Sequence, residues 1–252
     1  MKKLAIYSAI IGNYDQLPAH PAICPRADYY LFVGKGEAAK AVPGPWTVRE
    51  LDYSNRDPKL VSGYAKTHPR TLLPEYEYTL WVDANVGIAQ EAFFSVLQRK
   101  MEEGVPLSGV LHGGTDCAYE EAVRIVKGGR DSIFNVLRMI GFLRRNGLPG
   151  HAGLLETGVL LRRSGTDAAV TDFDENWWTL ISGISRRDQL SVSYCMRKAG
   201  LVPDALVPAG ADVRNHPFFS YTPHRTPSPQ RSFLYRKTRG PLVALTKWYA
   251  ER

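Results

Sequence analysis

The chain has 252 residues, of which 44% are hydrophobic and 23% are charged. This length and composition suit one substantial folded core, and they exclude a disordered or low-complexity chain. Lysine and arginine number 32 against 25 aspartate and glutamate residues, which gives a net charge of +7. This excess favours an anionic partner. Aromatic residues are not interleaved with the basic ones over the fold, so we expect no nucleic-acid partner.

The number and spacing of the cysteines indicate the redox environment of the protein. Cys24, Cys117 and Cys195 are far apart and form no CxxC pair, which speaks against a disulfide framework and favours a reducing environment. The apolar run at residues 4–11 is too short for a signal peptide, and no run reaches the roughly 18 residues of a membrane span. We therefore expect a cytoplasmic protein.

Apolar runs alternate with segments of helical periodicity along the chain. We expect strands over residues 4–11, 29–33, 46–51, 78–82, 107–111 and 154–162. We expect helices over residues 58–73, 90–103, 116–127, 130–146, 171–183 and 187–199. This alternation predicts an α/β fold with a Rossmann-type mixed, mostly parallel sheet flanked by helices.

The character of the chain changes near residue 212, so we predict one domain over residues 1–212 and a C-terminal extension over 213–252. Four prolines interrupt regular structure between residues 217 and 229, and residues 220–252 carry seven basic residues against Glu251 alone. Apolar residues lie between the basic ones. This pattern is typical of a peripheral contact with an anionic membrane surface, here the inner face. A segment that packs across the fold would show the same pattern.

The first candidate site is Trp81-Val82-Asp83-Ala84-Asn85. Side chains at positions i and i+2 of an extended segment point the same way, so Asp83 and Asn85 could both face a ligand at the carboxyl end of a strand. Their oxygens suit Mg²⁺ or Mn²⁺, or a ribose. A plain strand-to-turn transition would use the same residues.

Two further carboxylates are candidates for the chemistry. Asp188 follows Arg187 at the expected start of a helix, where it could orient a sugar hydroxyl or assist proton transfer. A first-turn acid that only stabilises the helix is the alternative. Glu156 precedes an apolar strand that contains Gly158, a residue that allows close approach of a backbone or ligand; an ordinary edge residue is the alternative.

Basic and turn residues near the first strand suggest a nucleotide site. Arg56 and Lys59 could neutralise a diphosphate, although two basic residues beside a proline are often only surface. The predicted nucleotide-binding residues at the end of the first strand are Ala9, Gly12, Asn13 and Tyr14. Gly12 permits close backbone approach, and Tyr14 could stack on the base.

Four residues are candidates for sugar or acceptor binding: His112, Asp116, Arg187 and Trp178. His112 could form a polar pocket wall in a Gly-rich turn. Asp116 is also explained as a helix cap. Trp178 could stack on a sugar face, although paired tryptophans in a helix are more often core and rim.

Six segments, in this order, resemble the family of TOD1/MUCI70-type glycosyltransferase-like proteins, formerly a domain of unknown function. The matching segments are Tyr7–Asp15, Pro58–Leu60, Trp81–Asp83, Asp116–Ala122, Glu156–Arg162 and Arg187–Ser191. They span residues 7 to about 195, roughly three-quarters of the chain. The resemblance implies a GT-A fold that binds a nucleotide-sugar and carries a metal-binding D-x-D. The Asp188-Gln189 pair is similar to that of retaining glycosyltransferases of the glycogenin-like class.

The resemblance therefore implies a glycosyltransferase that moves a sugar from a nucleoside-diphosphate donor, with a UDP-sugar favoured, to a glycan or lipid-linked acceptor, with retention. The implied catalytic residues are Asp188, Gln189 and Glu156. The implied ligands of Mn²⁺ or Mg²⁺ are Asp83, Asn85 and His216. Asn85 replaces the second acid of D-x-D and removes one negative charge. That departure favours an alternative, a catalytically inactive GT-A-like scaffold that binds a glycan or a nucleotide.

Overall fold

The computed structural model describes residues 2–12, 18–37, 44–202, 204–223 and 233–251. Seven strands form the central sheet: β1 (Lys2–Ile10), β2 (Asp28–Val33), β3 (Trp46–Glu50), β4 (Tyr76–Val82), β6 (Leu107–Leu111), β7 (Leu155–Arg162) and β8 (Asp204–Ala205). Their order is β3-β2-β1-β4-β7-β6-β8. β7 is antiparallel to both neighbours, while the other paired strands run parallel. The predicted α/β fold with a mixed, mostly parallel sheet is confirmed.

The helices are α1 (Pro58–Thr67), α2 (Pro69–Leu72), α3 (Ala92–Glu102), α4 (Ala118–Gly128), α5 (Ile133–Arg145), α6 (Ala168–Gly183), α7 (Val192–Lys198) and α8 (Phe233–Glu251). A 3₁₀ turn, η1 (Asp188–Leu190), precedes α7. The expected helix over residues 58–73 is divided at His68, because a residue before proline is disfavoured in the helical region. The expected helix over 187–199 is divided into η1 and α7 at Ser191.

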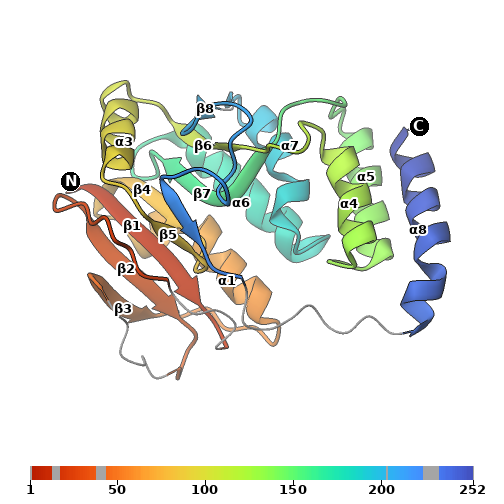
Figure 1. Cartoon of the computed structure of the whole chain (residues 1–252), viewed down its shortest axis with the longest axis horizontal. Helices are drawn as coiled ribbons and strands as arrows, with labels where there is room; N and C mark the ends of the chain where they lie inside the picture. Colours follow the sequence, from red (N-terminus) through yellow and green to blue (C-terminus); the bar gives the residue numbers. More distant parts are fainter. Residues whose placement is uncertain (1, 13–17, 38–43, 203, 224–232, 252) are drawn as a thin grey trace.

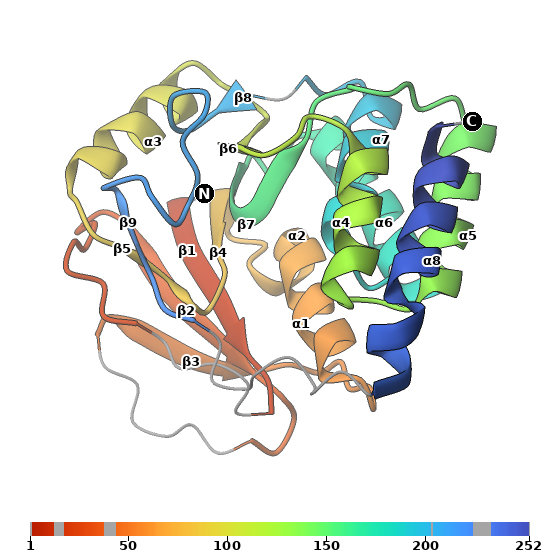
Figure 2. The same ribbon diagram turned by 45° about the vertical axis from the view of Figure 1, so that its right-hand side comes forward.

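The sheet is buried on both faces, which explains the continuous apolar character of its strands. Along β1, Leu4 and Ile6 pack toward one core, and Ala5 and Tyr7 pack toward the other. Figures 1 and 2 show α3 on one side of the molecule and α1, α4, α5, α6 and α7 on the other. Packing on both faces holds the sheet in place. The carboxyl ends of β1 and β4 therefore form a fixed edge from which side chains can project.

The chain beyond residue 212 returns to the fold. β9 (Phe219–Tyr221) pairs antiparallel with β5 (Val86–Ile88), directly after β4. α8 packs against α4 and α5 (Figures 1 and 2), where Thr246 is buried and Arg144 donates to the carbonyl of Ala250 at 2.6 Å. None of the helices in the described parts of the chain has both the length and the hydropathy of a membrane span. The division at residue 212 stays a prediction.

Candidate active site

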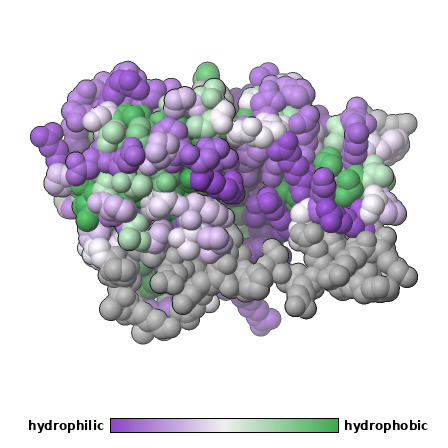
Figure 3. Space-filling view, viewed as in Figure 1, coloured by the Kyte–Doolittle hydropathy of each residue, from purple (hydrophilic) through white to green (hydrophobic). Residues whose placement is uncertain are grey.

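A cavity of about 300 Å³ lies where the carboxyl ends of β1 and β4 meet. Its walls come from the end of β1, the turn after β4, one face of α1, the start of β7, and η1. This edge of a parallel sheet is the usual ligand position in open α/β folds. Figure 3 shows the surface hollowed near its middle, with hydrophilic residues gathered around the hollow.

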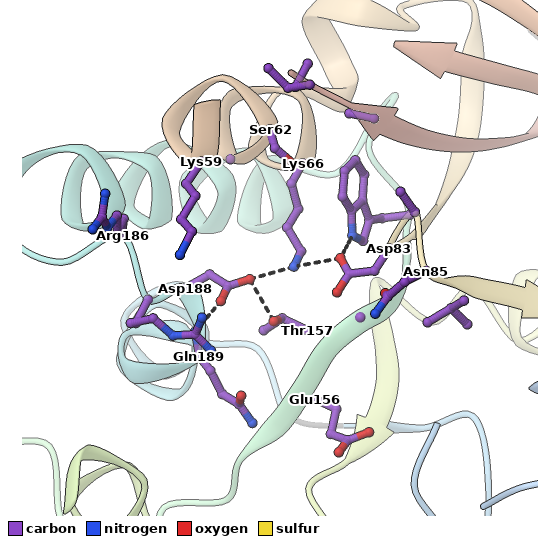
Figure 4. Close-up of a pocket in the computed structure, with 18 of the residues that line it drawn as sticks. Lys59, Ser62, Lys66, Asp83, Asn85, Glu156, Thr157, Arg186, Asp188 and Gln189 are labelled. Atoms are coloured by element: carbon purple, nitrogen blue, oxygen red, sulfur yellow. Dashed lines mark hydrogen bonds and ion pairs between the residues drawn. The ribbon is translucent and has the colours of Figure 1, made fainter. Parts of the chain in front are cut away.

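Lys66 lies at the centre of the polar side chains in the cavity (Figure 4). Its Nζ is 2.5 Å from Asp188 Oδ2 and 3.3 Å from Asp83 Oδ1. The Lys66 side chain is only 7% exposed. One ammonium therefore connects the turn after β4 with η1, two segments more than 100 residues apart in the chain.

The end of α1 fixes the position of Lys66. The last carbonyls of a helix lack intrahelical partners, and here the Lys66 carbonyl accepts hydrogen bonds from Tyr7 at 3.1 Å and Arg162 at 2.7 Å. Arg162 also pairs with Asp174 at 2.5 Å and donates to the Tyr7 hydroxyl. Because these side chains come from β1, β7 and α6, the cavity lysine is anchored to the sheet and the helix layer together.

Asp188 is held in its charged form. Its Oδ2 accepts from Thr157 at 2.7 Å as well as from Lys66, and its Oδ1 accepts from the backbone N–H of Gln189 at 2.9 Å. Burial alone would raise the pKa of Asp188, but the charges of Lys66 and Arg187 and these hydrogen bonds outweigh it and lower the pKa to about 2. The carboxylate is therefore ionised throughout the neutral range.

Asp83 is positioned by the strand end itself. Its backbone N–H donates to Gly158 O at 2.8 Å, and its Oδ1 accepts from Trp81 Nε1 at 2.7 Å. A Cβ on Gly158 would lie 3.3 Å from Asp83 Oδ2, so the glycine permits close approach of β7. Asn85 is buried and also lines the cavity.

The pKa of Glu156 is shifted in the opposite direction to that of Asp188. It accepts from the Val213 N–H at 3.1 Å and from Arg214 at 3.3 Å. Burial nevertheless raises the pKa of Glu156 above its usual range. Glu156 and Thr157 are neighbours on β7 and point to opposite faces, and Figure 4 shows Glu156 apart from the group around Lys66.

The lining carries more positive than negative charge. Among the described residues it holds six cationic side chains, those of Lys59, Lys66, Arg130, Arg186, Arg187 and Arg214, and three carboxylates, those of Asp83, Glu156 and Asp188. Desolvation and repulsion from Arg186 and Arg187 lower the pKa of Lys59. Arg186 is tied to Asp57, the residue that caps α1. A cavity with this excess favours an anionic ligand.

The residues present do not fit the divalent cation that the resemblance implies. The oxygens Asp83 Oδ1 and Asp188 Oδ2 are occupied by the Lys66 ammonium. Asn85 brings no charge. His216 does not line the cavity; its ring lies 4.4 Å from that of Phe218, and its Nδ1 accepts the Phe218 N–H. Over the described parts of the chain, no three His, Cys, Asp or Glu side chains form a metal-binding group.

The structure brings most of the predicted catalytic and charged residues together. Those that line the cavity are Asp188, Gln189, Glu156, Ala9, Lys59, Arg187, Asp83 and Asn85. They come from the end of β1, the turn after β4, the first turn of α1, the start of β7, and η1 with the residue that precedes it. Their assigned roles stay predictions.

Other predicted site residues lie outside the lining, and Asn13 and Tyr14 fall outside the described residues. Gly12 and Arg56 are exposed. The Nδ1 of His112 organises its own turn, accepting from the N–H groups of Gly114 and Thr115. Asp116 forms an exposed pair with His151 at 2.6 Å. The Trp178 ring packs against those of Tyr53, Tyr64 and His68.

Lys66 and Thr157 line the cavity but are not among the site residues predicted from the sequence. A lysine in the last turn of a helix is unremarkable, since it favours the negative end of the helix dipole. The available signal was spacing: Lys59, Ser62, Gly63 and Lys66 recur at the i, i+3, i+4, i+7 positions of one helix face, and all four line the cavity. Predicting Thr157 as a site residue would require knowing which face of β7 contacts η1.

No protein-family model and no curated protein sequence matches the chain. Among solved structures, an apo structure of the bifunctional glycosyltransferase WbbM is similar, with a TM-score of 0.46 and 9% sequence identity. The alignment covers 81% of this chain and 38% of that chain. At this level of similarity, nothing about the activity of the present chain follows from it.

Proposed function

We propose that the chain is a glycosyltransferase that moves a sugar from a nucleoside-diphosphate donor, with a UDP-sugar favoured, to a glycan or lipid-linked acceptor. Membership of the TOD1/MUCI70-type family and the GT-A fold are part of this proposal. The observation that carries it is the cationic cavity at the carboxyl ends of β1 and β4, which contains two fixed carboxylates, Asp83 and Asp188.

The charge distribution supports a diphosphate leaving group. Transfer breaks the bond between the anomeric carbon and the diphosphate oxygen, and the departing diphosphate keeps the electron pair. A bond then forms between the anomeric carbon and an acceptor hydroxyl, whose proton must be accepted. Lys59, Arg186 and Arg187 line the cavity as donors for the developing phosphate charge.

The two carboxylates with opposite pKa shifts suggest separate roles. Asp188, with its lowered pKa, is a poor proton acceptor and suits stabilisation of positive charge at the anomeric carbon. Glu156, whose pKa burial raises, is the better acceptor for the hydroxyl proton. We propose a retaining outcome on the resemblance of Asp188-Gln189 alone.

A binding protein without turnover is the second candidate. The observation that favours it is the replacement of the second D-x-D acid by Asn85, which lines the same cavity. Such a protein would bind a nucleotide or glycan and leave the sugar–phosphate bond intact.

A thermal-shift panel of UDP-, GDP-, CMP- and ADP-sugars, followed by a hydrolysis assay, separates these candidates. A ligand at 100 times its Kd stabilises the folded state by about 2.7 kcal/mol. The enzyme proposal expects a shift with one nucleotide class and release of that nucleoside diphosphate. A shift without release supports the binding protein, and no shift with any member contradicts both.

A further inference from the structure

We propose that the Lys66 ammonium takes the place of a divalent cation between Asp83 and Asp188, so that donor binding and transfer proceed without Mn²⁺ or Mg²⁺. The inference deepens the proposed function and rests on it. Its starting point is geometric: a single cation contacts carboxylates from two separate segments, at 2.5 and 3.3 Å.

Lys66 is held in this position. Its side chain is 7% exposed, and its Nζ lies 5.5 Å from the centroid of the Trp81 ring and 5.8 Å from that of the Trp177 ring. Its carbonyl is bound by Tyr7 and Arg162. A swing of the ammonium out of the site would leave the carboxylates of Asp83 and Asp188 without a cation between them, which is unfavourable in a partly buried position.

A metal ion would also meet unfavourable electrostatics. It would have to share the carboxylates with an ammonium in contact with both, in a cavity that already has three more cationic side chains than carboxylates among the described residues. A diphosphate needs no bridging metal where Lys59, Arg186 and Arg187 already face the same space. The protein therefore supplies from its own chain the charge that a metal would bring.

The first test uses UDP and isothermal titration calorimetry on the wild-type protein, once with EDTA and once with Mn²⁺. The inference expects Kd values that agree within about twofold. A Kd at least tenfold lower with Mn²⁺ would overturn it, while leaving the proposed function intact. If neither UDP nor the other nucleoside diphosphates bind in either buffer, the proposed function fails and metal-free donor binding fails with it; the second test still decides whether Lys66 takes the place of the cation.

The second test uses Mn²⁺ alone, with bound and free ion distinguished by electron paramagnetic resonance. Asp83→Asn shows whether any bound Mn²⁺ lies at the Asp83 site. The wild-type protein and Asp83→Asn are expected to bind Mn²⁺ equally weakly. Lys66→Met frees two carboxylates and is expected to gain at least tenfold in Mn²⁺ affinity. Lys59→Met is the matched control, because it removes a cavity ammonium from the same helix face but leaves Lys66 between the carboxylates; no gain is expected.

Wild-type Mn²⁺ binding that depends on Asp83 overturns the inference, and so does a Lys66→Met protein without any gain. Circular dichroism establishes that each variant is folded. If Lys66→Met does not fold, Lys66→Gln replaces it, and the two wild-type measurements still decide the question.

Discussion

At the scale of single residues, Asp188 shows how neighbours prepare a carboxylate. Lys66, Thr157 and the Gln189 N–H bind its two oxygens and keep it ionised. The same position at the start of η1 is what a simple helix-stabilising acid would occupy. Function and local stability therefore predict different consequences of one substitution.

Asp188→Asn is expected to reduce transfer at least about 100-fold, because it removes the charge that we propose stabilises the anomeric carbon. The amide oxygen of Asn can still accept from the Gln189 N–H, and the Thr157 hydroxyl can turn to accept from the amide NH2, so the fold should persist. Initial rates of sugar transfer and circular dichroism check this. Asp116→Asn, at an exposed acid outside the cavity, is the control. Activity of Asp188→Asn within a few fold of wild type would remove the catalytic role.

A second residue-scale prediction concerns the buried pair that anchors Lys66. Arg162 is 0% exposed and pairs with Asp174. Asp174→Asn leaves the guanidinium without a counter-charge, and we expect a loss of about 3 kcal/mol in the free energy of unfolding. Urea denaturation measures it. Asp172→Asn, on the exposed face of the same helix, should change stability by less than about 0.5 kcal/mol; equal losses in both variants would contradict the role of the pair.

At the scale of elements, α1 is the helix that shapes the site. Lys59 and Lys66 are two turns apart on its cavity face, while Arg56 precedes the helix and is exposed outside the lining. Asp57 caps the helix and accepts a hydrogen bond from Arg186. This contact places the Arg186 guanidinium, which lies just before η1 in the chain, beside the first turn of α1.

Lys59→Ala is therefore expected to weaken nucleotide binding about tenfold, since a hydrogen bond to a charged group contributes about 1.5 kcal/mol or more. Arg56→Ala should change the Kd by less than about twofold. Calorimetry with the nucleotide identified in the thermal-shift panel gives both values. If Arg56→Ala has the larger effect, the nucleotide lies outside the cavity described.

The strands and helices also show which parts of the fold can be predicted from the sequence. The sequence predicts β1, β2, β3, β4, β6 and β7, because burial on both faces of the sheet gives apolar runs. It does not predict the short strand β5. The break between α1 and α2 at His68 follows from Pro69, which disfavours the helical conformation of the residue before it. The antiparallel placement of β7 and the pairing of β5 with β9 are long-range contacts, and local periodicity contains no information on them.

The candidate site was predictable where polar residues follow strands, as at Asp83 and Asn85. The bridge through Lys66 was not, because it depends on the distance between α1 and η1 in the folded chain. His112, Asp116 and Trp178 have ordinary structural partners, and only the folded structure separates such residues from those lining a cavity.

At the scale of the whole molecule, α8 covers α4 and α5 with one face and leaves Leu245 and Trp248 46% and 50% exposed. Hydrophobic surface lies among hydrophilic residues over these helices at the right of Figure 3. We propose that this face touches the inner face of an anionic membrane, where a lipid-linked acceptor would be found, and that the protein is cytoplasmic.

The double variant Leu245→Glu/Trp248→Glu is expected to lose vesicle binding, because two half-exposed apolar side chains that would enter the membrane are replaced by charges that an anionic leaflet repels. Co-sedimentation with phosphatidylserine-containing vesicles at low salt measures it. Ile23→Glu, at an exposed apolar residue beside β5, is the control and should bind as wild type does. Equal binding by all three proteins, or no binding by any, would contradict membrane contact.

We propose above all that this cavity binds a nucleotide-sugar and cleaves its sugar–phosphate bond. Phosphorus NMR of the donor identified in the thermal-shift panel, incubated with wild-type protein and with Asp188→Asn, tests it most directly. With water taking the sugar in place of the acceptor, the resonances of the sugar-linked diphosphate are expected to give way to those of the free nucleoside diphosphate with the wild-type protein, and to persist with Asp188→Asn. An unchanged donor spectrum with the wild-type protein, or equal cleavage by both proteins, would contradict it.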